Sequence, residues 1–228
     1  MVKALALACF MILAAISAHA QQRQSDALTY GGGGNGGPDP NGWGLAISGG
    51  YEGPTGAMRS YYSGAPALSV SLLKNWNGFT FNGTVGYASF KPKQDTAYID
   101  VDGTQVGYVK YYNYNSLEFF VGGAYNIPVA DVATLYVGLN VGAYSNSAKY
   151  DVNTIEGNTS ASVSGTTELV APKIGLNFMI DNHFTFGIEG RYNFQFGSSK
   201  TSAETDGYGY SAQSIKTYTV SGVLSYFF

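Results

Sequence analysis

The stretch SIKTYTVSGVLSYFF, residues 214–228, decides the fold class. Apolar and polar side chains alternate along it, and this period of two residues is that of a β-strand and not of a helix. One face collects Tyr218, Val220, Gly222, Leu224, Tyr226 and Phe228, and Ser and Thr dominate the other. A strand ending in Tyr-Phe-Phe must be paired, and its apolar face must meet an apolar surface. We interpret that surface as lipid; the last strand of a soluble sandwich is the alternative.

The first twenty residues are expected to be a cleaved secretory signal peptide. Lys3 precedes an uncharged apolar run from Ala4 to Ala18, and Ala18 and Ala20 place small residues at the expected cleavage site. Beyond residue 20 no apolar stretch reaches the ~18 residues that a transmembrane helix requires. The single cysteine, Cys9, lies within this leader, so we expect an exported chain without disulfides.

Composition restricts the class of the chain further. The sequence holds 31 Gly, 19 Tyr and 13 Phe with only 12% charged residues, which favours strands. Its 12 Lys and Arg against 15 Asp and Glu give a net charge of −3, which argues against nucleic acid as a partner. Residues 21–42 are rich in Gly and Pro and are expected to form a flexible periplasmic linker, so that the folded domain spans 43–228.

From Trp43 onward the sequence divides into eight runs of alternating character. In the seventh run, large apolar residues at even positions face away from Glu189, Arg191 and Asn193 at odd positions. The eight runs are 43–52, 67–74, 79–90, 108–127, 134–145, 167–180, 184–196 and the closing stretch 214–228.

The lengths of the connections indicate which face is outside. Long links (53–66, 91–107, 146–166, 197–213) alternate with short ones (75–78, 128–133, 181–183). Short periplasmic turns and long extracellular loops are typical of bacterial outer-membrane barrels, in which the apolar face points outward. The sequence therefore predicts an all-β, eight-stranded antiparallel up-and-down transmembrane β-barrel, closed by pairing of the last strand with the strand at Trp43.

In this pattern the chain resembles the small eight-stranded outer-membrane barrels of Gram-negative bacteria, of the OmpX, OmpA-barrel and opacity-protein type. The most specific match is Gly222, Leu224, Tyr226 and Phe228, which correspond to the signal that the barrel-assembly machinery reads in such proteins. The resemblance implies a location in the outer membrane, and it implies contact with the lipid of that membrane and with the assembly machinery.

Four charged residues lie on the inward face of three runs, namely Glu118, Lys173, Glu189 and Arg191. A three-residue turn between the sixth and seventh runs would place Lys173 opposite Arg191 and Gly175 opposite Glu189. Two facing cations require carboxylates between them, so we predict a structural ion network in the barrel interior. Its alternative role is a selectivity filter or gate.

Other candidate sites are weak. His183 lies in a short turn without a partner nucleophile, and is expected to be a polar turn residue. Asp100, Asp102 and Gly103 lack the ligand spacing of a calcium loop, and we expect a hairpin turn there. We therefore expect no catalytic residue, metal or cofactor.

Three function classes remain open. The preferred one is a non-enzymatic outer-membrane barrel with a structural, adhesive or surface-interaction role, in which four extracellular loops meet a ligand or host surface. The first alternative is a narrow channel for small solutes. The second is a lipid-modifying enzyme, against which the scarcity of histidine argues, since the chain has two.

Overall fold

The computed structural model describes residues 41–155, 157–197 and 215–228. The expected signal peptide, with Ala18 and Ala20, lies outside the described residues. So does the expected linker, apart from its last two residues.

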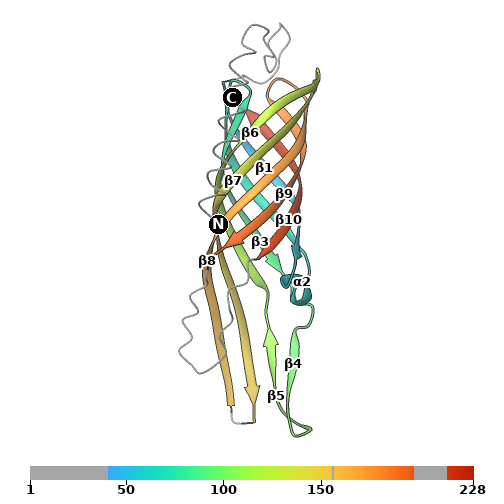
Figure 1. Ribbon diagram of the computed structural model, residues 1–228, viewed down its shortest axis with the longest axis vertical. Helices are drawn as coiled ribbons and strands as arrows, with labels where there is room; N and C mark the ends of the chain where they lie inside the picture. Colours follow the sequence, from blue (N-terminus) through green and yellow to red (C-terminus); the bar gives the residue numbers. More distant parts are fainter. Residues whose placement is uncertain (1–40, 156, 198–214) are drawn as a thin grey trace.

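The described part of the chain is almost entirely β-structure (Figure 1). A single helical turn, α2, covers Met58–Tyr61. None of the helices in the described part is long and apolar enough to cross a bilayer. The strands are β1 (Trp43–Thr55), β2 (Ala65–Trp76), β3 (Phe79–Phe90), β4 (Thr96–Val101), β5 (Thr104–Tyr111), β6 (Tyr114–Ala130), β7 (Ala133–Thr154), β8 (Gly157–Met179), β9 (Phe184–Phe196) and β10 (Lys216–Phe227).

Eight of these strands form a closed antiparallel ring in the order β1-β2-β3-β6-β7-β8-β9-β10. The ring closes where β10 pairs with β1, with Leu224 opposite Ile47. The Phe228 N–H extends this ladder by donating to the Trp43 carbonyl at 2.9 Å. The predicted eight-stranded barrel and its closing pair are confirmed.

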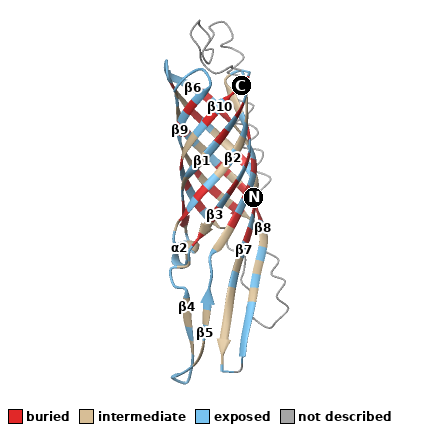
Figure 2. Ribbon diagram, turned by 180° about the vertical axis from the view of Figure 1, so that it is seen from behind, coloured by how far each residue is buried: buried red, intermediate tan, exposed pale blue. Residues whose placement is uncertain are grey.

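Burial alternates along every wall strand, as the sequence pattern predicts (Figure 2). In β1, Ala46 is 4% exposed and points into the barrel, whereas Ile47 is 59% exposed and points out. Small and polar residues fill the interior, because eight strands enclose a lumen only wide enough for side chains. The outer surface is an exposed apolar belt, the surface that a membrane barrel presents to lipid.

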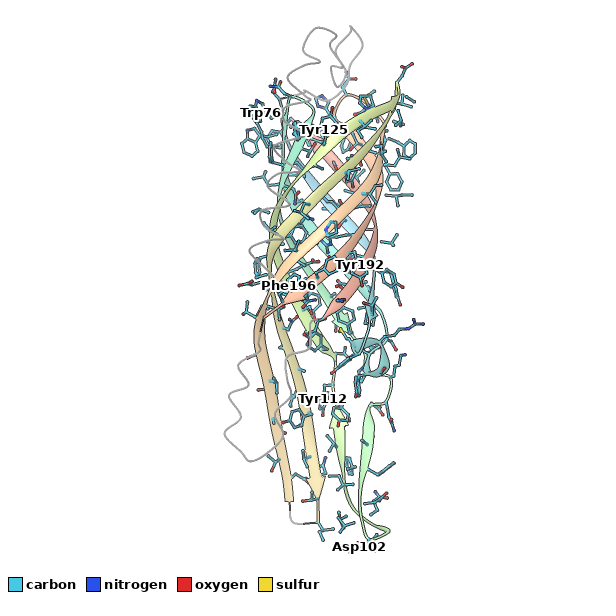
Figure 3. All side chains as sticks on the ribbon, viewed as in Figure 1. Trp76, Asp102, Tyr112, Tyr125, Tyr192 and Phe196 are labelled. Atoms are coloured by element: carbon cyan, nitrogen blue, oxygen red, sulfur yellow. The ribbon has the colours of Figure 1, made fainter. Side chains whose placement is uncertain are left out.

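Aromatic side chains mark both ends of the belt (Figure 3). Trp76 and Tyr125 lie near the end with the short turns, and Tyr192 and Phe196 lie toward the opposite end of the barrel. Two such girdles are typical of membrane barrels, since these rings suit the interface between lipid and water. We take the end with short turns as periplasmic and the end with long connections as extracellular.

The tight turns follow the local chemistry of the sequence. Asn77 and Gly78 connect β2 to β3 with φ values of 46° and 82°, the left-handed conformation that Asn-Gly hairpins favour. Asp102 (φ 50°) and Gly103 (φ 78°) connect β4 to β5 in the same way. The hairpin turn expected at Asp102 and Gly103 is confirmed.

The extracellular connections differ from the prediction. Links 91–107 and 146–166 were expected to be loops, but the first contains β4 and half of β5, and the second continues β7 and β8. The fourth predicted run, 108–127, is also wrong at its start, because 108–111 belong to β5 and the wall strand begins at Tyr114. These segments form a four-stranded sheet, β4-β5-β7-β8, which we call the extracellular extension (Figure 1). The alternation of apolar and polar residues does not reveal these strands, because a strand outside the membrane needs no continuous apolar face. Its backbone hydrogen bonds form whatever the side chains are.

Candidate functional site

The four predicted interior residues all project into the lumen from neighbouring parts of the wall. Lys173 pairs with Arg191 and Gly175 with Glu189 across the β8–β9 ladder, which confirms the predicted register. Pleating turns the odd-numbered residues of both strands inward. Glu118 reaches the same space from β6.

Arg191 and Glu118 form the central ion pair of the lumen. The Arg191 Nη2 donates to Glu118 Oε2 at 2.6 Å, and the two residues are 8% and 2% exposed. The guanidinium also lies 4.6 Å from the centroid of the Phe120 ring. This pair is a short, charge-assisted hydrogen bond shielded from solvent.

Lys173 and Glu189 form a second and looser pair. Their charged atoms are 3.9 Å apart, and Lys173 Nζ donates a 2.8 Å hydrogen bond to Asn82 Oδ1. Tyr136 donates to Glu189 Oε2 at 3.0 Å. Lys173 thus points to β3 and Arg191 to β6, so the two cations that face each other across the ladder are held by different partners.

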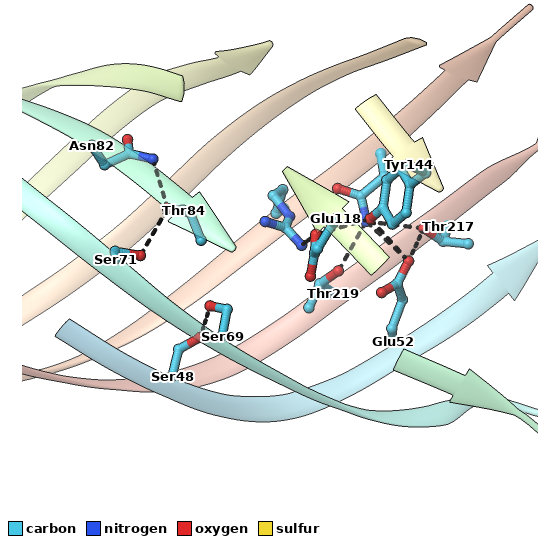
Figure 4. A network of polar contacts seen from close by, with 12 residues as sticks. Ser48, Glu52, Ser69, Ser71, Asn82, Thr84, Glu118, Tyr144, Thr217 and Thr219 are labelled. Atoms are coloured by element: carbon cyan, nitrogen blue, oxygen red, sulfur yellow. Dashed lines mark hydrogen bonds and ion pairs between the residues drawn. The ribbon is translucent and has the colours of Figure 1, made fainter. Parts of the chain in front are cut away.

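The most buried acid of the lumen, Glu52 of β1, was missed by the sequence reasoning (Figure 4). It is fully buried and accepts hydrogen bonds from Thr217, Asn193 and Tyr144, the last at 3.3 Å. Tyr144 also reaches Glu118 at 3.1 Å, and therefore bridges the two carboxylates. One signal was available, because Glu52 continues the inward face of the first predicted run, where a charge is unusual.

Together these side chains form what we call the lumen plug: Glu52, Glu118, Tyr144, Arg191, Asn193 and Thr217. All of its members are buried, and they occupy the extracellular half of the barrel. A cavity of about 80 Å³ adjoins the plug, and its lining combines apolar residues with polar ones that include Asn82, Lys173 and Glu189. Side chains therefore fill the lumen at the plug, and a small cavity remains next to the plug.

A second polar cluster lies outside the membrane, on the extracellular extension. Tyr112 donates to Asp151 Oδ2 at 2.6 Å, and Ser160 donates to Asp151 Oδ1 at 2.7 Å. Both hydroxyl groups lower the pKa of Asp151, and the hydrogen bond from Tyr112 has the larger effect. Lys110 and Lys149 lie 5.5 and 5.3 Å from the centroid of the Tyr112 ring. The cluster joins β5, β7 and β8 across the sheet.

His183 lies in the periplasmic turn, as expected. Its backbone carbonyl accepts from the Phe227 N–H at 2.8 Å, and its ring Nδ1 lies 2.9 Å from the Phe227 carbonyl. The Asp181 carboxylate accepts the backbone N–H groups of His183 and Phe184, both at 2.7 Å. His183 therefore attaches the end of the closing strand to the neighbouring turn. Among the described residues, no group of three or more His, Cys, Asp and Glu could hold a metal ion.

The residues of the expected assembly signal lie along the outer face of β10. Leu224 and Tyr226 are each 40% exposed, and Phe228 is 61% exposed. The Tyr226 ring packs against Phe184, with 4.9 Å between the ring centroids. Gly222 lies opposite Gly49 of β1.

Comparison with known proteins agrees with this architecture. No protein-family model and no curated protein matches the sequence. Among solved structures, Neisserial surface protein A aligns with a TM-score of 0.53 and 11% identity, covering 82% of this chain and 97% of that one. The fold is that of the small outer-membrane β-barrels.

Two further solved barrels align over most of this outer-membrane barrel. The outer membrane protease OmpT of Escherichia coli has a TM-score of 0.48 at 8% identity and covers 89% of this chain and 99% of its own. Ail, the attachment invasion locus protein of Yersinia pestis, has a TM-score of 0.43 at 14% identity and covers 82% and 99%. The alignment with Neisserial surface protein A, together with the closed ring of eight strands, confirms the predicted fold class and the resemblance to small outer-membrane barrels.

Proposed function

We propose that this protein is a non-enzymatic surface barrel of the Gram-negative outer membrane, which meets a ligand or host surface through its extracellular side. The extracellular extension carries this proposal. β7 and β8, with 22 and 23 residues, continue well beyond the wall strands β1 and β2, with 13 and 12. The added length is ordered sheet, which supports a contact surface better than a flexible loop would.

The side chains of the extension support the same conclusion. Tyr98 is 65% exposed, Tyr108 38% and Tyr112 36%, and each is attached to a hydrogen-bonded strand or to its end. Exposed tyrosines on a rigid support offer contact area at low entropic cost. The lipid-facing belt, by contrast, supports embedding in outer-membrane lipid, and we expect insertion by the barrel-assembly machinery.

Adhesion of whole cells tests the proposal. Bacteria that display the full chain should adhere to a basement-membrane matrix more strongly than bacteria that display a variant lacking Thr96–Tyr111. Both proteins must reach the outer membrane in equal amounts, which surface labelling measures. Equal adhesion of the two strains to the matrix would contradict a contact role for the extension.

A narrow channel is the second candidate, and the cavity beside the plug, which Lys173 and Glu189 help to line, favours it. Conduction would require the side chains of the lumen plug to move, because they are buried against one another. Planar-bilayer recordings of the purified protein separate the candidates. We expect no steady conductance, whereas regular ion-selective steps that change in Glu118→Gln would support a channel.

A further inference from the structure

The lipid-facing surface carries a groove that runs between two rows of side chains. The strand register defines both rows. The row nearer the extracellular side contains Leu117, Tyr87, Leu68, Gly49 and Gly222, each paired with the next across a ladder. The other row contains Val85, Val70, Ile47, Leu224 and Phe186 in the same manner. Members of both rows line one groove of about 590 Å³.

Two glycines widen this groove, because they leave a gap in the row of side chains nearer the extracellular side. Gly49 and Gly222 face each other at the seam where β1 meets β10, in outward positions that large residues occupy to either side. A Cβ on Gly49 would meet Leu68 Cδ2 at 3.5 Å, and one on Gly222 would meet Phe186 Cε2 at 3.7 Å. Both are ordinary contact distances, so the backbone leaves room for side chains that the sequence omits.

The groove crosses the membrane belt obliquely, because the strands of a barrel are tilted by ~35–45°. Tyr87 lies three residues from the extracellular end of β3, whereas Phe186 lies two residues from the periplasmic start of β9. Four steps of ~4.8 Å between strands give the groove a length of about 19 Å. This length is comparable with one leaflet of a hydrocarbon core ~30 Å thick.

The surroundings of the groove restrict its occupant to hydrocarbon. The groove is continuous with the apolar belt, and its walls are aliphatic and aromatic side chains. The Phe186 ring lies beside Gly222 at the periplasmic end. At the other end the Tyr87 hydroxyl donates to Asn115 Oδ1 at 2.9 Å. This hydrogen bond points the Tyr87 side chain toward the extracellular rim. The end at Tyr87 therefore lies on the side of the outer leaflet, from which an acyl chain can enter.

We propose that this groove is a binding site for one acyl chain of an outer-leaflet lipid, seated over Gly49 and Gly222. The proposal is independent of the surface role described above. It assigns a purpose to the paired glycines, since a Leu or Val at either position would be compatible with the backbone and would bury more apolar area in lipid.

Native mass spectrometry of the folded protein, extracted from outer membranes in mild detergent, tests the site. The wild type should retain one lipopolysaccharide molecule through detergent exchange. Gly49→Leu fills the groove and should lower that retention about tenfold, which corresponds to ~1.4 kcal/mol. Gly83→Leu is the matched control, because Gly83 also faces outward and a Cβ there meets nothing within 4 Å. Val70→Trp blocks the groove from its other wall and replaces Gly49→Leu if that variant fails to fold.

Four results would overturn the proposal. These are a wild type that retains no lipid, equal retention by Gly49→Leu and wild type, retention of phospholipid in place of lipopolysaccharide, and a dimer that Gly49→Leu dissociates. The last result would assign the groove to a second copy of the chain.

Discussion

The buried Glu118–Arg191 ion pair shows how strongly one side chain can affect the stability of this barrel. Both groups are taken out of water, and the net gain of a buried ion pair over an apolar pair is small. Removal of one partner is costly, because the other charge then remains buried without a partner. The stability of the barrel should therefore respond strongly to either residue of the pair.

Glu118→Gln should lower the free energy of unfolding by about 3 to 5 kcal/mol, because Arg191 loses its charge partner. Urea unfolding in lipid vesicles, followed by heat-modified gel mobility, measures the change. Glu189→Gln should cost less, since Glu189 pairs with Lys173 at 3.9 Å and Lys173 keeps Asn82. An unchanged stability in both variants would refute the proposed structural role of the interior network.

Two controls identify burial as the cause. Lys149 and Asp151 form a pair at 4.0 Å in which the Lys149 side chain is exposed, so Lys149→Gln should leave stability nearly unchanged. The double variant with Glu118→Leu and Arg191→Met should recover most of the loss, because an apolar pair of similar volume needs no charge compensation.

At the scale of elements, the β8–β9 turn and the closing strand depend on each other. Asp181 accepts two backbone N–H groups within the turn, and His183 binds the end of β10. These contacts join the sixth connection between wall strands, β8 to β9, to the last strand. We therefore expect changes at either element to affect closure of the barrel.

The turn should weaken in acid. The backbone N–H groups of His183 and Phe184 lower the pKa of Asp181, so its folded pKa lies below its unfolded value. The contribution of Asp181 to stability is then complete above the unfolded pKa, and is lost as the pH falls from about 4 through the folded pKa. Urea midpoints of wild type and Asp181→Ala should differ at pH 7 and converge at low pH. A difference that is independent of pH would contradict this assignment.

Phe228→Ala should reduce insertion more than stability. Phe228 is 61% exposed, so its side chain adds little packing, while the resemblance to related barrels gives it a role in recognition by the assembly machinery. Pulse-chase measurement of outer-membrane arrival gives the first quantity, and urea unfolding of refolded protein gives the second. Normal arrival of the variant would remove Phe228 from the assembly signal.

Local and short-range features could be predicted from the sequence. The Lys173–Arg191 register followed from parity and from a three-residue turn. The contacts of Glu52 with Tyr144 could not be obtained in this way, because they cross the lumen and depend on the tilt and stagger of strands that are not neighbours. The extracellular extension was missed for another reason, since its sequence lacks the lipid-facing pattern on which the strand assignment depended.

At the scale of the whole molecule, the barrel and the extracellular extension are separate in their stabilising contacts. The wall is closed by its own ladders and by the lumen plug, while among the described strands β4 and β5 pair with the rest of the sheet through β7 alone. The barrel should therefore fold without them.

Replacement of Thr96–Tyr111 by a short Gly-Ser linker tests this independence. The variant should insert, retain heat-modifiable mobility and unfold at the same urea concentration as the wild type, within the error of the measurement. Gly103→Val in the full chain is the milder version, because it strains only the tip turn at φ 78°. A barrel that fails to assemble without β4 and β5 would show that the extension contributes to folding.

The unbroken course of β7 and β8 has a mechanical consequence. Their ladder runs without interruption from Ala133 opposite Phe178 to Thr154 opposite Gly157. At ~3.4 Å per residue, the 22 residues of β7 extend for about 75 Å. A force that pulls the outer tip away from the cell is transmitted along these strands into the barrel wall. There it acts in shear on all the hydrogen bonds that join β7 and β8 to the neighbouring wall strands at the same time. The extension can therefore bear tension as a tether anchored in the wall, and would resist detachment better than a loop joined to the rim by two single strands.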